Sequence, residues 1–252
     1  MVPEFIFKTL FQNNHARFQA LCKANALSLD YGSNKSTLYL LKAIFEEREY
    51  ADYFPFYEDA VIVDVGAHYG YFSMFAHLNL GKASTIIAIE PDPNNFNLLK
   101  KNLFDQKIEN VKTMNVAVSD NVGDASLYLG NSVNSTLVSD YALNESGGGN
   151  IKVKTTTLAQ IFFDNGLSKV DFLKLDCEGA EYAIMLNSDP EWFRNVNTIS
   201  MEFHDIRDAR YTGNVLAARC IQLGYDIVKF QYERTTRGLN FGKMIATRLL
   251  KK

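Results

Sequence analysis

From residue 60 onward, short apolar runs alternate with segments in which apolar residues recur at helical spacing. The apolar runs predict five strands, at 60–65, 85–89, 111–118, 170–175 and 196–203. Helical spacing predicts helices at 69–79, about 180–186 and about 215–223, and a further helix opening at Asp92 and Pro93 as N-cap and first residue. Strands that alternate with helices form βαβ units. We therefore expect an α/β, Rossmann-like fold with helices on both faces of a mostly parallel sheet.

Two further apolar runs, 225–232 and 241–249, break this rhythm because only residues 233–240 separate them. A parallel connection needs a crossover of a dozen or more residues, so these two runs should form an antiparallel hairpin. The main sheet would then hold seven strands, and the last would run antiparallel to its neighbours.

Two segments lie outside the alternating pattern. Residues 1–59 are interpreted as an amino-terminal helical extension, and residues 60–252 as the main domain with an insertion at about 125–154. In the insertion, strand-like runs at 125–129 and 151–154 flank a glycine-rich stretch, 146–149, expected to be a flexible loop. Both segments are candidates for a substrate pocket over the carboxyl edge of the sheet, with a packing helix as the alternative for the first. The aromatic residues of the first segment either stack on an acceptor or belong to the core: Tyr50, Tyr53, Phe54, Phe56 and Tyr57.

The composition is that of an ordinary globular protein, with 252 residues, 47% hydrophobic and 22% charged. The net charge of -3 argues against a general nucleic-acid binder, for which a basic surface is typical. Three scattered cysteines, Cys22, Cys177 and Cys220, indicate neither a disulfide framework nor a zinc ribbon. No apolar run approaches the ~20 residues of a membrane span, and residues 1–18 lack the apolar stretch of a signal peptide. We therefore expect a soluble, cytoplasmic protein.

The first strand ends in a glycine turn that runs from Asp64 through Gly66 to Gly70. Glycines let the backbone turn tightly, and the N-terminus of the following helix offers N–H groups to an anion. Twenty residues after Gly70, at the end of the second strand, Glu90 is placed to accept both hydroxyls of an adenosine ribose. The two features together predict a site for an adenosine-containing cofactor. A strand-to-helix turn without any ligand is the alternative.

The turn lacks the glycine pattern of a dinucleotide site. Counted from Gly66, the later glycines of G-x-G-x-x-G would fall at His68 and Tyr71, and no P-loop Gly-Lys-Ser/Thr is present. Such a turn suits a ligand that has a carboxylate and an ammonium group in place of phosphates, as S-adenosylmethionine has. Asp64 and nearby backbone could hold the ammonium end, and N–H groups near Gly70 the carboxylate.

A second group of ionisable residues follows the fourth and fifth strands. Asp176, Glu178 and Glu181 lie within six positions, and Glu202 and His204 end the fifth strand on one face. Burial beside a like charge raises the pKa of a carboxyl group toward that of a general base, so we expect Asp176 or His204 to accept a proton, with Glu178 assisting. Glu181 equally suits a first-turn position that complements the helix dipole. Asp176, Glu202 and His204 could also hold Mg²⁺, but no metal ligand is assigned.

Taken together, these stretches resemble the FkbM family of class I S-adenosylmethionine-dependent methyltransferases over about residues 60–205. Residues 63–71 resemble the first motif of the family, 89–93 its ribose-binding motif, 115–119 the segment that lines the adenine, and 134–137 a small-hydroxyl segment between its third and fourth strands. The Lys-x-Asp-x-Glu-Gly-x-Glu signature of residues 174–181 is the most specific match. His68 stands where the family more often has asparagine.

The resemblance implies a seven-stranded sheet of order 3-2-1-4-5-7-6 with strand 7 antiparallel, and O-methylation of hydroxyls on sugars or polyketides. The candidate catalytic residues are Asp176, Glu178 and His204. The implied cofactor, S-adenosylmethionine, would be bound by Asp64, Gly66, Ala67, His68, Gly70, Glu90, Pro91, Asn115 and Ala117. The expected partner is a small-molecule or glycan acceptor, with no nucleic acid and no membrane; a divalent cation and the oligomeric state stay open.

Three other functions stand as alternatives. A non-catalytic module would bind the adenosyl ligand without transferring a methyl group. A nicotinamide-dependent oxidoreductase is disfavoured by His68 and Tyr71. The third is a methyltransferase that acts on another acceptor, a protein or a nucleic acid, and the acidic stretch 176–179, which would repel phosphates, disfavours the nucleic acid.

Overall fold

A seven-stranded sheet forms the centre of the computed structural model, which describes residues 40–130, 135–138, 146–206, 208, 210–234 and 240–249. The strands are β1 (Val61–Val65), β2 (Thr85–Ile89), β3 (Val111–Met114), β7 (Val170–Leu175), β8 (Val196–His204), β9 (Asp226–Arg234) and β10 (Asn240–Thr247). They lie in the order β3-β2-β1-β7-β8-β10-β9. The first five pair in parallel, whereas β10 is antiparallel to both β8 and β9. Numbered within this sheet alone, the strands have the predicted order 3-2-1-4-5-7-6, and the predicted hairpin is confirmed.

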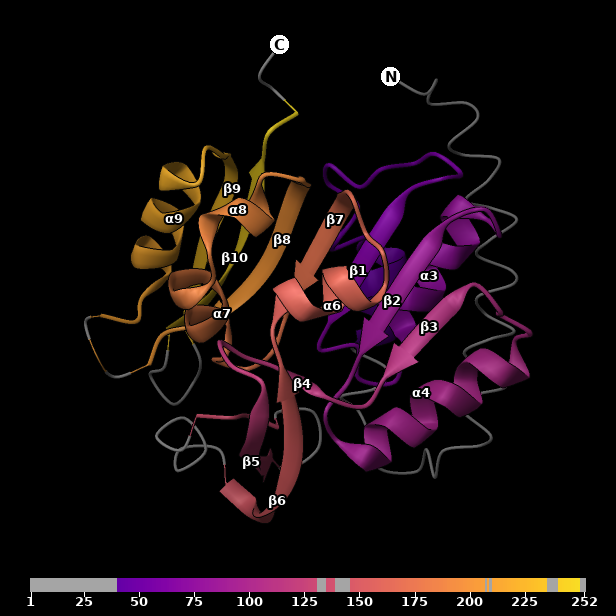
Figure 1. The fold of residues 1–252 in the computed structure, drawn as a ribbon, viewed down its shortest axis with the longest axis horizontal. Helices are drawn as coiled ribbons and strands as arrows, with labels where there is room; N and C mark the ends of the chain where they lie inside the picture. Colours follow the sequence, from indigo (N-terminus) through magenta and orange to yellow (C-terminus); the bar gives the residue numbers. More distant parts are fainter. Residues whose placement is uncertain are drawn as a thin grey trace.

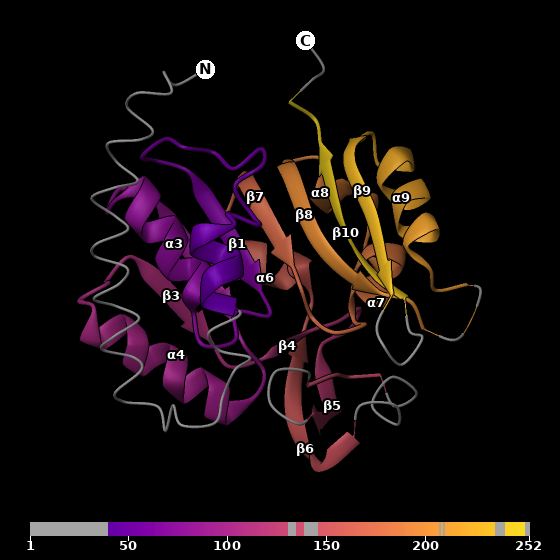
Figure 2. The same cartoon turned by 180° about the vertical axis from the view of Figure 1, so that it is seen from behind.

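Helices cover both faces of the sheet (Figures 1 and 2). One face carries α6 (Leu158–Asp164), α7 (Glu181–Asn187), α8 (Pro190–Phe193) and α9 (Gly213–Gln222); the other carries η1 (Lys42–Glu46), α3 (Tyr71–Leu80) and α4 (Pro93–Asp105). Successive side chains of a strand point to opposite faces of the sheet, and each face has its own cluster of buried apolar residues. Val63 and Val65 belong to the first cluster, under α6–α9, and Ile62 belongs to the second. Burial on both faces explains the nearly continuous apolar sequence of the parallel strands.

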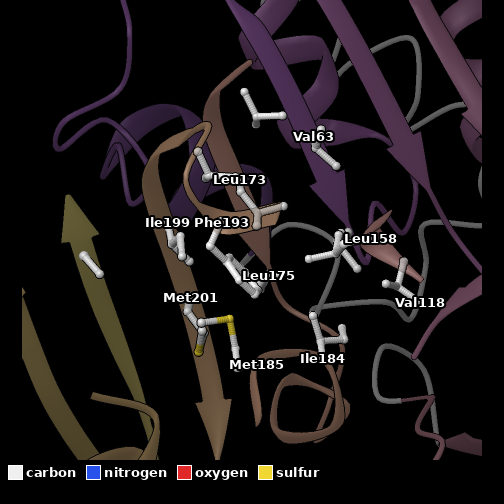
Figure 3. Packing of buried hydrophobic residues seen from close by; sticks show 14 of the residues in the cluster. Val63, Val118, Leu158, Leu173, Leu175, Ile184, Met185, Phe193, Ile199 and Met201 are labelled. Carbon is white, nitrogen blue, oxygen red and sulfur yellow. The ribbon is translucent and has the colours of Figure 1, made fainter. Parts of the chain in front are cut away.

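Figure 3 shows the packing of the first cluster. Leu175 of β7 and Met201 of β8 lie near Met185 of α7, and Leu173 and Ile184 belong to the same cluster further away. All five side chains are at most 1% exposed. Full burial of one such side chain contributes about 1.5–3 kcal/mol. This layer therefore holds α7, and the loop that leads into it, firmly against the sheet.

The ends of the first two helices follow from local sequence. The Asp92 side chain accepts a hydrogen bond from the Asn94 backbone at 2.8 Å, and Pro93 is the first helical residue of α4, as predicted. Gly81 is the C-cap residue of α3. The start of α3 was predicted two residues too early, because Gly70 has a left-handed φ of +83° and the helix begins only after it.

The predicted third strand, 111–118, is two strands. β3 ends at Met114, and β4 (Ala117–Val118) joins a separate three-stranded sheet of order β4-β6-β5. The other members of this sheet are β5 (Gly123–Gly130) and β6 (Ser146–Thr156), so the predicted strand-like runs pair in antiparallel fashion, with Leu127 opposite Ile151. In Figure 1 the small sheet lies beyond the carboxyl ends of the parallel strands.

The glycine-rich stretch 146–149, predicted to be a flexible loop, belongs to β6. Ser146 of β6 pairs with Gly130 of the neighbouring strand β5. Strand pairing uses backbone groups, so a stretch without large side chains can join a ladder that its neighbours already define.

The described part of the amino-terminal segment packs on the η1 face. The Phe45 ring meets the Phe75 ring of α3 edge to face at 5.7 Å, and the Phe54 ring meets the Phe172 ring of β7 at 5.3 Å. Residues 1–39, including Cys22, lie outside the described residues, as do most of the predicted helical extension and Asn134. Among the residues that the structure describes, no helix has the length and apolarity that crossing a membrane requires.

Candidate functional site: a glycine turn beside an acidic pocket

A cavity of about 550 Å³ opens at the carboxyl ends of β1, β2, β7 and β8. Its volume is typical of a ligand pocket, and the carboxyl edge is where open α/β sheets bind ligands. Both candidate pocket segments contribute to its walls. Leu40, Ile44 and Tyr50 come from the amino-terminal segment, and Leu127 and Leu137 from the insertion.

Gly66 lies where the turn after β1 passes the end of β7. Its φ is +77°, and a Cβ atom there would lie 1.7 Å from the carbonyl oxygen of Asp176, so only glycine fits. The backbone N–H groups of Gly66 and Ala67 both donate to the Ile89 carbonyl, which ties the turn to the end of β2. Gly66, Ala67 and His68 line the cavity, as their predicted role requires.

Glu90 lies in the cavity wall at the end of β2 and is 5% exposed. Its Oε2 accepts from the His68 backbone at 2.8 Å, and its Oε1 accepts from the Asp92 backbone at 2.9 Å. Burial raises the pKa of Glu90 to about 7, although these two donors act in the opposite direction. The carboxyl group is thus held in place by the backbone and available to hydroxyl donors in the cavity, beside Pro91 and Ala117.

Asp64 is fully buried behind the glycine turn and is not among the residues that line the cavity. Its Oδ2 accepts from the Ser73 hydroxyl at 2.7 Å, and its Oδ1 lies 3.2 Å from Lys174 Nζ. Lys174 lines the cavity, donates to the Gly66 carbonyl at 2.9 Å and lies 3.4 Å from Asp176 Oδ2. The predicted direct contact between Asp64 and a cofactor is therefore corrected to an indirect one, through Lys174 and the turn.

Gly70 and Asn115 also lie off the cavity wall. Gly70 lies against α4, where an added Cβ would be 3.2 Å from Leu99 Cγ, so its glycine serves helix packing and the left-handed turn. The Asn115 side chain donates to the backbone carbonyls of Glu90 and Pro91 at 2.8 and 3.0 Å. It holds the end of β2 in place, and its neighbours on the chain, 116–118, form the wall instead.

The loop before α7 is shaped by Glu181. Its two carboxylate oxygens accept from the backbone N–H groups of Cys177 and Gly179, each at 2.8 Å, and its side chain is fully buried. Glu178 then adopts a left-handed φ of +53°. Thr136 donates its hydroxyl to the Glu178 carbonyl, so the small-hydroxyl segment packs directly on this loop. Glu181 is a first-turn residue that supports the loop, and Glu178 is the one that lines the cavity.

His204 brings the remaining acidic side chains together. Its Nε2 lies 3.3 Å from Glu178 Oε2 and 3.5 Å from Glu202 Oε1. Burial disfavours the charged imidazolium, but Glu178 and Glu202 outweigh it and raise the pKa of His204 to about 10. Burial, with Asp176 and Glu202 nearby, raises the pKa of Glu178, whereas the charge on His204 lowers it. We take the pair as an imidazolium beside a carboxylate, because each charge favours the other.

The sequence did not point to Glu49 or Lys243 of this pocket, and it left Tyr50 open between stacking on an acceptor and a place in the core. Glu49 and Lys243 form an ion pair of 2.6 Å, and Lys243 also lies 3.7 Å from Glu202. Tyr50 donates to Asp176 Oδ2 at 3.2 Å. Lys174 was visible within its motif, but nothing in the sequence links Glu49 and Tyr50 to residues more than a hundred positions away. Within the described residues, no group of three or more histidine, cysteine, aspartate or glutamate side chains has the arrangement of a metal site.

The family profile described as "Methyltransferase FkbM domain" matches residues 64–227. The chain belongs to the FkbM methyltransferase family. The matched region contains the glycine turn, Glu90, the acidic loop and His204, so the family match covers both halves of the cavity.

Curated relatives agree with this assignment. The chain is 28% identical over 210 residues to "Methyltransferase sdnD" of Sordaria araneosa, covering 72% of this chain and 80% of the relative. It is 27% identical over 185 residues to "31-O-demethyl-FK506 methyltransferase FkbM" of Streptomyces tacrolimicus, covering 62% and 69%. Among solved structures, the FkbM methyltransferase of Methylobacillus flagellatus matches with a TM-score of 0.50 at 14% identity, covering 92% of this chain and 59% of that one, which indicates a shared fold.

FkbM methyltransferases use S-adenosylmethionine, and the cavity of this FkbM protein fits that cofactor. Glu90 presents a buried carboxyl group that can accept ribose hydroxyls, and the side chain missing at Gly66 leaves the turn open to close approach. Val116, Ala117 and Val118 supply an apolar wall beside Glu90. These residues would hold the adenosine end, which leaves Asp176, Glu178 and His204 for the reacting end.

Proposed function

We propose that this FkbM methyltransferase O-methylates a hydroxyl group of a small natural product or a sugar. The observation that carries the proposal is the position of Asp176, which lines the cavity and adjoins the glycine turn through its own backbone. An alcohol must lose its proton as it is methylated, so a proton acceptor beside the methyl donor is the feature that an O-methyltransferase needs. The Streptomyces tacrolimicus relative, named for methylating 31-O-demethyl-FK506, supports an oxygen acceptor.

S-adenosylmethionine supplies an electrophilic methyl group when bound. This chain's own residues orient the acceptor and take its proton. The expected rise in the pKa of Asp176 is wrong. Burial acts to raise this pKa, but Lys174 and His204 lower it below the usual range, so the carboxylate is ionised at neutral pH. Holding the acceptor oxygen and this carboxylate in one pocket supplies most of the rate, because positioning dominates a displacement of this kind.

Of the two candidate bases, we favour Asp176. His204 already carries a proton at neutral pH, since its pKa lies near 10, and a protonated imidazole cannot accept another. We propose that His204 instead holds the Glu178 and Glu202 carboxylates in position beside the acceptor. Glu178, in the same wall, assists by shaping the pocket around the acceptor oxygen.

The test is a methyl-transfer assay on hydroxylated acceptors, each paired with its deoxy analogue, that measures release of S-adenosylhomocysteine. We expect transfer to the hydroxylated member of at least one pair, and an Asp176→Asn variant that binds the cofactor but turns over about 10²–10⁴-fold more slowly. Asp124→Asn, the same change at an exposed site in the small sheet, should be as active as the wild type. Equal activity of Asp176→Asn and wild type, or transfer to both members of every pair, would overturn the proposal. Cofactor binding without transfer would favour a non-catalytic module.

A further inference from the structure

Asp176 is restrained by two donors on one of its oxygens. Tyr50 Oη donates to Oδ2 at 3.2 Å, and Lys174 Nζ lies 3.4 Å from the same atom. Within the described part of the chain, neither contact uses Oδ1. The carboxylate is thus oriented by Oδ2, and Oδ1 is the oxygen that an acceptor hydroxyl would meet.

Tyr50 is itself held on every side. It is 6% exposed, its ring meets the Phe72 ring edge to face at 5.0 Å, and Lys174 Nζ lies 5.5 Å from the ring centre. Burial and the nearby Asp176 raise the pKa of Tyr50 well above its usual value, so the phenol keeps the proton that it donates to Asp176. Tyr50, for which the sequence left a place in the core open, therefore lies in the cavity wall, and its hydroxyl contacts Asp176, the proposed base.

The residues around Tyr50 are tied to the far edge of the sheet. Its neighbour Glu49 pairs with Lys243 of β10 at 2.6 Å, and Asp52 pairs with Lys229 of β9 at 3.0 Å. These contacts do not involve Asp176. The position of the phenol is therefore set independently of the group to which it donates.

We propose that Tyr50 is a positioning residue for methyl transfer, which holds Asp176 Oδ2 so that Oδ1 receives the acceptor proton. This inference rests on the proposed function, because it needs Asp176 to be the proton acceptor. It also gives the amino-terminal segment, which precedes the matched family region, a part in the reaction.

The test variant is Tyr50→Phe, which removes the hydroxyl and keeps the ring against Phe72. We expect turnover to fall by about 10-fold or more, since a hydrogen bond to a charged group is lost, while the affinity for S-adenosylmethionine changes less than about 2-fold. The acid limb of turnover should move to higher pH by about one unit, because the Asp176 carboxylate loses a donor. Tyr53→Phe, at an exposed site three residues on, should match the wild type in all respects.

Other ionisable groups face Asp176, and a pH profile must be read against them: Lys174 and Asp64 beneath it, Glu178 and Glu181 on the following loop and helix, Glu202 and His204 on β8, and Glu49 beside Tyr50. A ¹³C-carboxyl NMR titration, assigned with Asp176→Asn, reads Asp176 directly and does not depend on turnover. Its pKa should rise in Tyr50→Phe and not in Tyr53→Phe.

The outcomes separate the two proposals. Wild-type turnover in Asp176→Asn would remove the base assignment and this inference with it. An inactive Asp176→Asn beside a Tyr50→Phe variant with wild-type turnover and an unshifted Asp176 pKa would overturn the role of Tyr50 alone.

Discussion

Gly66 and Asp176 touch through their backbones: a methyl group on Gly66 would lie 1.7 Å from the Asp176 carbonyl oxygen. The two residues directly follow two neighbouring parallel strands, β1 and β7. The turn suited to the cofactor and the loop that carries the proposed base are therefore held at a fixed separation by main-chain atoms. Side-chain motion elsewhere in the cavity leaves this spacing unchanged.

We expect Gly66→Ala to be far more damaging than Gly81→Ala. Both glycines have almost the same φ, +77° and +78°, but an added Cβ at Gly81 meets nothing within 4 Å. Gly81→Ala should cost the backbone strain alone, about 1–3 kcal/mol in the free energy of unfolding. Gly66→Ala must also displace the Asp176 loop, so it should cost more and weaken cofactor binding. Urea unfolding of the two variants measures the difference, and equal costs would contradict the close approach.

The affinity for S-adenosylmethionine should depend on the ionisation of Glu90. Its pKa lies near 7 in the protein without ligand, and the carboxylate is the form that accepts two ribose hydroxyls. Affinity should therefore be constant above about pH 8 and fall toward tenfold per unit below about pH 6. Calorimetric titration of Glu90→Gln should show weaker binding, by about 10–100-fold at pH 8, and the loss of this pH dependence. The exposed Glu109→Gln serves as the control, and an identical pH profile in Glu90→Gln and wild type would refute the role.

Lys174 should be worth much more to stability than a surface lysine. It is 3% exposed and serves two carboxylates, Asp64 and Asp176, that would be left without it. Lys174→Met should lower the free energy of unfolding by about 3–5 kcal/mol at pH 7. The matched change Lys101→Met removes an exposed pair with Asp105 and should cost no more than about 1 kcal/mol. Urea denaturation of both variants measures the two costs. Similar midpoints would contradict the stabilising role of Lys174 between Asp64 and Asp176.

His204 should make the protein less stable at alkaline pH. Its pKa is near 10 in the folded state and near 6.5 when unfolded, so its stabilising charge is fully present below pH 6.5 and is lost as the pH rises through 10. Between pH 8 and 10 the wild type should lose about 2 kcal/mol, and His204→Gln should lose much less. A wild-type stability that is flat over this interval would show that the imidazolium does not form.

Much of the fold was predictable because its signals are local. The apolar runs of the parallel strands, the Asp92–Pro93 helix start and the short 233–240 connection each follow from a few neighbouring residues. Helix α6 was missed although Thr157 caps it and Leu158, Ile161 and Phe162 lie at helical spacing. Its pattern is only seven residues long, and a run of that length is ambiguous between helix and strand.

The residues of the site also divide into those that local sequence predicts and those that it does not. Gly66, Glu90 and Asp176 are found from the sequence, since strand ends converge at one edge of a parallel sheet. Asp64 and Asn115 belong to the expected motifs, but their side chains hold neighbouring residues in place and do not line the cavity. A motif does not show whether its side chains reach a cavity. Tyr50 and Lys243 reach the pocket through contacts across the whole chain, which no local pattern encodes.

Because β10 runs in the reverse direction, the cavity is built from two stretches that lie far apart in the sequence. Because β10 is antiparallel, it brings its beginning to the pocket, with Phe241 opposite His204 and Lys243 opposite Glu202. The residues that we expect to face S-adenosylmethionine follow β1 and β2, whereas Phe241 and Lys243 line the cavity from a strand much later in the sequence. Under the proposed function, substitutions in β10 would alter the acceptor side while the glycine turn and Glu90 stay intact, so redesign for other acceptors would begin at β10.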